Sequence, residues 1–150
     1  MELLTAWSDG AGTAGVLNKN DRCAYAYTEG EISKMKMLHV TIRTEKFDDE
    51  MEFYREIIGL KIINDMRPMG RNMIFLVDSE GETEIEVIET PGAGNAGNEN
   101  LSIGFQTENV AAKREELIAK GMDVSPMIQP NPHVQFFFVK DPAGVNIQFM

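Results

Sequence analysis

The chain has 150 residues and a formal net charge of −10, from 14 basic and 24 acidic side chains. Nucleic acids and anionic membranes attract basic surfaces, so this acidity argues against both as partners. No apolar run approaches the roughly 20 residues that span a bilayer, no secretory signal is evident, and Cys23 is the only cysteine, which together predict a cytoplasmic protein without disulfides.

Residues 1–34 differ in character from the rest of the chain. They are rich in Gly, Ala and Asn and show no sustained hydrophobic period, which is typical of a flexible or loosely attached extension. We therefore expect one domain over 35–150, long enough to bury a hydrophobic core.

The first clear pattern is an alternation of apolar and polar residues over 37–44, which predicts a half-buried strand. Successive side chains of a strand point to opposite faces. His39, Thr41 and Arg43 therefore share one face, and their apolar neighbours face the core.

A helix and three strands follow in the first half. Apolar residues at helical spacing, acids in the first turns and Gly59 at the C-terminal cap predict a helix over 45–60. The strands are expected over 60–65, 72–77 and 82–89. The order of this first module, 36–90, is βαβββ.

Residues 91–99 are rich in Gly and Asn and are predicted to link module one to module two, 100–150. The second half is expected to contain a strand over 101–107, a helix over 108–120, a strand or loop over 122–128, a turn over 129–132, and strands over 133–139 and 145–150. This order is again βαβββ.

The two halves can be superimposed with an offset of 62 to 63 positions. The helix-ending glycines, Gly59 and Gly121, lie 62 positions apart, as do Val77 and Val139 before the last turn of each half. Two copies at so long a period indicate a duplicated module. The predicted fold class is α+β, with two tandem βαβββ modules.

The same superposition pairs His39 with Ser102 and Glu86 with Gln148. If the modules are related by an approximate two-fold axis, the four side chains converge on one cavity. An imidazole and a carboxylate suit Zn²⁺, Ni²⁺, Mn²⁺ or Fe²⁺. Gln148 adds a neutral carbonyl oxygen, whereas Ser102 is a poor ligand.

Other polar residues have two interpretations each. His133 precedes the strand beside that of Gln148, where it is either a ligand or base in the cavity or an exposed turn residue. Arg43, Arg67 and Arg71 are candidate substrate clamps because guanidinium groups bind carboxylates, although surface arginines are common.

Four stretches together resemble the vicinal oxygen chelate superfamily, which includes glyoxalase I, methylmalonyl-CoA epimerase, extradiol dioxygenases, and fosfomycin- and bleomycin-resistance proteins. They are 38–42 (LHVTI), 53–60 (FYREIIGL), 84–87 (EIEV) and 138–149 (FVKDPAGVNIQF). The resemblance covers about 36–150 and is strongest to lactoylglutathione-lyase-like members. It implies a curved, mostly antiparallel sheet around a cleft, and a homodimer.

The resemblance also implies a function. A divalent metal (Zn, Ni or Mn) would be held by His39, Glu86 and Gln148, with Ser102 at the fourth position as a substrate contact. The expected activity is that of a metal-dependent lyase or isomerase resembling lactoylglutathione lyase, a carbon–sulfur lyase that stabilises an enediolate from a thiol hemithioacetal or a similar small molecule. An amide is no base near neutrality, so Glu86 or His133 becomes the candidate base. Arg43 and Arg71 would contact the substrate.

Two other functions fit the same scaffold. One is a non-catalytic small-molecule-binding or resistance protein, favoured by Ser102 and Gln148 at ligand positions. The other is an extradiol dioxygenase, which needs two histidines and a glutamate and is disfavoured by Ser102.

Overall fold

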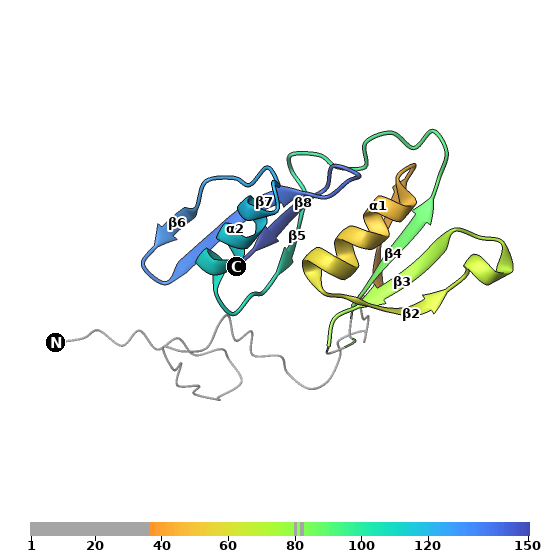
Figure 1. The fold of residues 1–150 in the computed structure, drawn as a ribbon, viewed down its shortest axis with the longest axis horizontal. Coiled ribbons are helices and arrows are strands. Elements are labelled where there is room, and N and C mark those ends of the chain that lie inside the picture. Colours follow the sequence, from red (N-terminus) through yellow and green to blue (C-terminus); the bar gives the residue numbers. More distant parts are fainter. Residues whose placement is uncertain (1–36, 80, 82) are drawn as a thin grey trace, which may run out of the picture. The chain divides into compact units, whose positions relative to one another are not determined.

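Two sheets of four strands each carry the fold of the computed structural model (Figure 1). The structure describes residues 37–79, 81 and 83–150, which belong to the compact unit Lys36–Met150. The predicted extension over 1–34, including Cys23, lies outside these described residues. No helix among the described residues is long and apolar enough to cross a membrane.

Module one follows the predicted order. Its elements are β1 (His39–Thr44), α1 (Phe47–Glu52), a π-helical continuation η1 (Phe53–Ile58), β2 (Lys61–Asp65), a short 3₁₀ turn η2 (Arg67–Met69), β3 (Met73–Val77) and β4 (Glu84–Glu89). The sheet order is β1-β4-β3-β2, with β1 parallel to β4 and the other pairs antiparallel. The helix ends at Gly59, whose φ of 93° is accessible to glycine at little cost.

Module two repeats this topology. Its elements are β5 (Ser102–Phe105), α2 (Val110–Ala119), β6 (Ile128–Asn131), β7 (Val134–Lys140) and β8 (Asn146–Phe149), in the sheet order β5-β8-β7-β6. The strand β5 is parallel to β8, as β1 is to β4. The α+β class and the tandem βαβββ modules are thus confirmed, with each module forming its own mixed sheet.

The strand β6 lies later in the chain than predicted. The sequence pattern indicates a strand or loop over 122–128 and a turn over 129–132, but the strand is Ile128–Asn131. It tolerates Pro130 because it is the edge strand of its sheet, where a missing N–H need not break a ladder. In the predicted stretch, Val124 forms only an isolated bridge to Val139.

The superposition of the last two strands also needs a one-residue correction. Leu76 pairs with Ile85 in module one, and Val139 pairs with Ile147 in module two. Val139 therefore corresponds to Leu76 and not to Val77. The extra residue of module one lies in the turn between β3 and β4.

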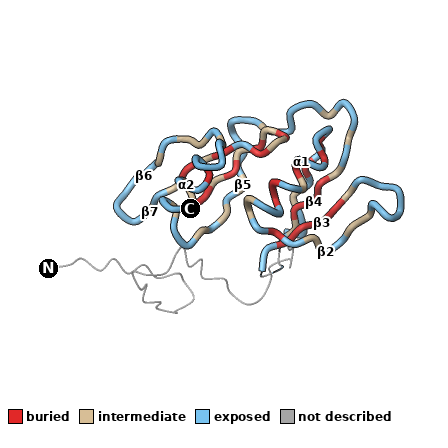
Figure 2. Tube along the Cα trace, in the orientation of Figure 1, coloured by how far each residue is buried: buried red, intermediate tan, exposed pale blue. Residues whose placement is uncertain are grey.

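One hydrophobic core joins the two modules (Figure 2). One face of each sheet contributes to it, so that Ile42 and Val87 of module one belong to the same buried cluster as Phe137 and Ile147 of module two. From η1, the ring of Tyr54 reaches Phe105 of β5, with 6.4 Å between centroids. We call the opposite side of each sheet, which turns away from this core, its open face.

Buried polar groups also connect α1 and η1 to the turn between β7 and β8. The hydroxyl of Tyr54 donates to Asp141 Oδ2 at 3.0 Å. The backbone N–H of Ala143 donates to Glu50 Oε2 at 2.9 Å, and Lys46 Nζ donates to the Pro142 carbonyl at 3.1 Å. Glu50 and Tyr54 are fully buried, so their two hydrogen bonds are shielded from water, and together with the exposed Lys46 bond they fix the turn against module one.

Glu50 is an acid in an apolar environment. Its Oε1 atom is buried without a hydrogen-bond partner among the described residues. Burial, and then the hydrogen bond and charge of Asp141, raise the pKa of Glu50 to about 9. The Glu50 side chain is therefore protonated at neutral pH. Its proton is then available for the hydrogen bond with Asp141.

The linker between the modules is packed against this same turn. Ala96 N donates to the Ala143 carbonyl at 2.9 Å. A Cβ atom added at Gly97 would overlap the carbonyl group of Gly144, and one added at Gly144 would overlap the side chain of Asn95. Glycine at position 97 thus lets two backbones approach closely, and glycine at position 144 leaves room for the Asn95 side chain.

Candidate functional site

The open face of module one carries the polar residues of β1. His39, Thr41 and Arg43 are exposed, whereas Ile42 and Thr44 between and after them are 2% and 1% exposed. The strand thus alternates as its sequence predicts.

His39 meets Glu86 on this face. The strand β4 lies beside β1 in parallel register, with Thr41 opposite Glu86. The Nε2 atom of His39 lies 3.8 Å from Glu86 Oε2, and the Thr41 hydroxyl donates a hydrogen bond to the same oxygen. The ring of Phe75 stands edge-on to His39, with 6.2 Å between centroids. The structure therefore brings the two predicted metal ligands together.

Thr41 is a site residue that sequence reasoning passed over. It holds the carboxylate of Glu86, which is only 9% exposed, from the neighbouring strand. Its place two residues after His39 on the same strand face was visible in the sequence. The parallel pairing of β1 with β4, which puts it opposite Glu86, was not predicted.

The His39–Glu86 pair offers one nitrogen and one oxygen donor. A separation of 3.8 Å is compatible with two ligands about 2.0–2.2 Å from a shared ion. In the described part of the chain, no group of three or more His, Cys, Asp or Glu side chains gathers in a way that could hold a metal ion. Module one alone thus supplies two candidate metal ligands.

The corresponding positions of module two lie on its own open face. Ser102 is exposed at the start of β5, and Gln148 is half-buried on β8. Gly104 is opposite Gln148, where Thr41 is opposite Glu86, so the amide of Gln148 has no hydroxyl partner at that position.

The two open faces turn away from the one shared core. Among residues 37–79, 81 and 83–150, no hydrogen bond or ion pair connects His39 or Glu86 with Ser102 or Gln148. Among the described residues, His39 and Glu86 are thus the two members of the predicted set that contact each other.

The remaining candidates lie at the surface. His133 is exposed in the turn between β6 and β7, where its backbone N–H binds Asn131. Arg43 is exposed on the open face of module one, and Arg71 is exposed between η2 and β3. Arg67 forms hydrogen bonds to Asp65, which lower the pKa of that carboxyl to about 2.

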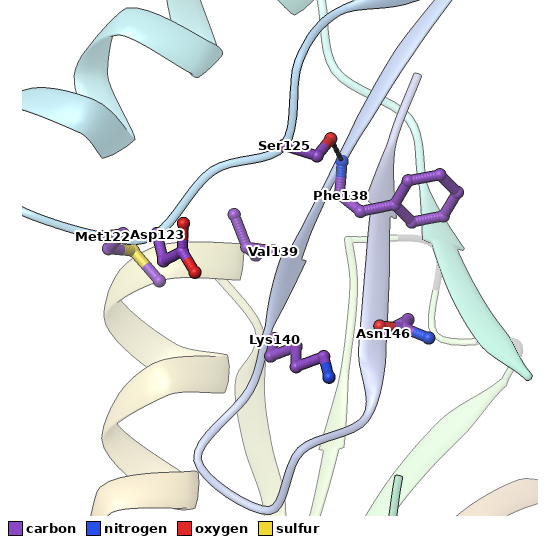
Figure 3. A pocket seen from close by; sticks show the side chains of 7 residues that line it. All are labelled: Met122, Asp123, Ser125, Phe138, Val139, Lys140 and Asn146. Atoms are coloured by element: carbon purple, nitrogen blue, oxygen red, sulfur yellow. Dashed lines mark hydrogen bonds between the residues drawn. The ribbon is translucent and has the colours of Figure 1, made fainter. Parts of the chain in front are cut away.

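Two adjoining hollows lie on module two, of about 330 and 370 Å³. Both are lined by Phe138, Lys140 and Asn146, which project from neighbouring strands (Figure 3). No sequence pattern singles out these three residues. Lys140 is the last residue of the apolar strand β7. Asn146 precedes Gln148 by two positions, a spacing that places both residues on the same strand face.

Fold and site together define a glyoxalase-like protein of two tandem modules. A sequence profile described as the Glyoxalase/Bleomycin resistance protein/Dioxygenase superfamily matches residues 36–149. The chain belongs to this family.

Individual relatives show how the family varies. A lactoylglutathione lyase from Neisseria meningitidis serogroup A is 25% identical over 124 residues, which cover 77% of this chain and 90% of the relative. Among solved structures, a lactoylglutathione lyase from Agrobacterium tumefaciens has a TM-score of 0.60 at 14% identity, covering 79% of this chain and 94% of the other. An antibiotic-binding protein from a Streptomyces species has a TM-score of 0.62 at 16% identity, covering 79% and 97%. At these identities the two structures establish the fold alone.

Proposed function

We propose that the protein is a metal-dependent lyase or isomerase resembling lactoylglutathione lyase. The observation that carries this proposal is the His39–Glu86 pair, 3.8 Å apart on an open sheet face and fixed by Thr41. The 25% identity to the Neisseria meningitidis enzyme over most of both chains supports it.

In this proposal, His39 and Glu86 hold a divalent ion, and Gln148 contributes an amide oxygen. Such an ion, when bound, polarises neighbouring oxygen atoms of a small-molecule substrate, for example a thiol adduct. Glu86 is the carboxylate at this site that can accept a proton, because the amide of Gln148 does not. His133 is the second candidate base, and Arg43, Arg71 and Ser102 are candidate substrate contacts.

A homodimer completes the site in this proposal. Within one chain, no hydrogen bond or ion pair among the described residues joins His39 or Glu86 to Gln148, and we propose that a second copy places Gln148 opposite His39. Each dimer would then contain two sites, with one module from each chain in each. Sedimentation equilibrium tests this arrangement, and a monomer that binds metal with full affinity would contradict it.

The central experiment is the metal content of the purified protein and its affinity for Zn²⁺, Ni²⁺ and Mn²⁺. We expect His39→Ala and Glu86→Ala each to weaken binding by at least about tenfold, because loss of one ligand leaves too few donors. Glu89→Ala, at an exposed position of the same strand, is the matched control. If the protein binds none of the three ions, a metal-dependent function is refuted.

Turnover is tested separately. Formation of a lactoyl thioester from methylglyoxal and glutathione, lost in Glu86→Ala and retained in Glu89→Ala, would support the lyase. Metal binding without formation of the thioester would refute this choice of substrate and leave the metal site standing.

The second candidate is a small-molecule-binding protein on the same fold. Two features of Gln148 favour it. Gln148 has an amide where the corresponding residue of module one, Glu86, has a carboxylate, and Gln148 lies opposite Gly104, whereas Glu86 lies opposite the hydroxyl-bearing Thr41. The expected result is ligand binding that is unchanged by a chelator and by His39→Ala. No observation favours an extradiol dioxygenase, since His39 is the one histidine that the described residues place beside Glu86.

A further inference from the structure

The open face of module two contains a lysine without a partner. Lys140 is exposed on β7, and no residue in 37–79, 81 or 83–150 forms a salt bridge or side-chain hydrogen bond with its ammonium group. Most other lysines of the domain have such partners: Lys46 binds Pro142, and Lys113 and Lys120 bind Glu116. In a chain with a net charge of −10, this ammonium group is a local positive site.

Lys140 also lies where a ligand fits. The two hollows that it lines, of about 330 and 370 Å³, have the size of sites for small organic molecules. Phe138 lines both and packs edge-on against Phe136, with 5.6 Å between centroids. The hollows therefore combine one cation with an aromatic wall.

Asn146 gives the hollows a fixed polar group. Its amide nitrogen donates to the carbonyls of Asn98 and Leu101 at 3.1 and 3.4 Å. These bonds orient the amide, so its oxygen is the atom left to accept a hydrogen bond from a ligand.

Acidic residues limit the charge that a ligand can carry. Asp123 lines one hollow and Glu99 lines the other, so Lys140 lies in a groove with a carboxylate in each part. A polyphosphate or another polyanion would meet repulsion there, whereas a single carboxylate at Lys140 would not.

The register of the strands relates this groove to the proposed metal site. Lys140 pairs with Asn146, and Phe138 pairs with Gln148. Residues two apart on a strand are separated by about 7 Å on the same face. A ligand lying along β7 and β8 would thus have its carboxylate at Lys140, its apolar part over Phe138 and its other end near Gln148.

We infer that the open face of module two binds a small monoanionic molecule, a carboxylate with an apolar segment, through the ammonium group of Lys140 and the ring of Phe138. The binding itself requires no metal. Only the further step, that this carboxylate is the substrate end about 7 Å from Gln148, rests on the proposed function.

The test is an NMR titration of the chelator-treated full-length protein with propanoate, 3-phenylpropanoate and 3-phenylpropanamide. We expect 3-phenylpropanoate to bind more tightly than propanoate, and at least about fivefold more tightly than its neutral amide, because the amide lacks the charge that pairs with Lys140. Shifted backbone signals should include those of β7 and β8.

Three variants complete the experiment. Lys140→Gln should weaken carboxylate binding by about fivefold or more, and Lys140→Arg should retain it. Lys61→Gln, at an exposed strand position of module one, is the matched control and should bind like the parent. Unchanged binding by Lys140→Gln, equal binding of acid and amide, or no binding of either carboxylate would overturn the inference.

The outcome is distinguishable from a failure of the proposed function. Lys140→Gln should leave metal affinity unchanged, whereas His39→Ala should leave carboxylate binding to the chelator-treated protein unchanged. A protein that binds carboxylates but no metal would retain this site and lose the lyase proposal. A protein that binds metal but no carboxylate would retain the lyase proposal and refute the carboxylate site.

Discussion

Replacing Glu50 with glutamine removes the buried acid between the two modules while keeping its shape. The amide oxygen of Gln can accept the hydrogen bond that Ala143 N now donates to Oε2 at 2.9 Å. Its NH₂ group then occupies the position of Oε1, which has no partner among the described residues, and can donate toward Asp141. The variant thus keeps the contacts and loses the titration.

The magnitude follows from the pKa of Glu50, about 9 in the fold against 4.5 for an ordinary glutamate. Between these values the unfolded chain has released the proton and the folded chain still holds it. The stabilisation is therefore complete below pH 4.5 and is lost as the pH rises to 9. At about 1.4 kcal/mol per pH unit, the free energy of unfolding should fall by up to about 3 kcal/mol between pH 7 and 9.

Urea denaturation at pH 6, 7, 8 and 9 measures this slope. The parent protein should lose stability steadily over the range, and Glu50→Gln should vary much less and exceed the parent at pH 9. Glu115→Gln, whose side chain is 73% exposed, controls for the change in net charge. If Glu50→Gln and the parent have parallel slopes, Glu50 is not protonated in the fold and the reasoning is wrong.

Substitutions at three further positions probe the contacts that hold the fold, each by its free energy of urea unfolding. Tyr54→Phe should cost about 1–3 kcal/mol, because it removes the hydroxyl that donates to buried Asp141; a neutral result would mean that water replaces the donor. Gly97→Ala should cost more than about 2 kcal/mol, because its Cβ would overlap the Gly144 carbonyl; unchanged stability would show that the linker detaches readily. Asn109→Ala should cost about 1 kcal/mol, because the Asn109 side chain caps the N-terminus of α2, and Asn109→Ser should restore most of the loss.

Much of the fold was predictable because strand and helix periods differ. Alternation located β1, and the duplicated pattern predicted both βαβββ modules. The errors arose where local composition opposed the tertiary context. Pro130 indicates a turn, but an edge position lets β6 include it. The continuation η1 is π-helical, which no spacing of apolar residues distinguishes from an α-helix.

The candidate site also has a part that the sequence predicts and a part that it does not. The choice of His39 and Glu86 came from the superposition of modules together with the family resemblance, whereas the parallel pairing of β1 with β4, which places the two residues side by side, was not predicted. The placement of Ser102 and Gln148 depends on how the modules pack. The sequence contains no local signal that the two modules share one hydrophobic core or that Tyr54 of η1 packs against Phe105 of β5, so it does not predict how the two open faces are placed.

The packed linker has a consequence for anyone who alters this chain. Its Gly- and Asn-rich sequence resembles the stretches where tags, insertions and new termini are usually tolerated. Here Ala96 and Gly97 lie against the turn that also holds Glu50 and Asp141, so an insertion would push on the contact between the modules. Glu115 on α2, whose side chain is exposed, is the better place for a label, because it lies outside that contact and has no role in the proposed site.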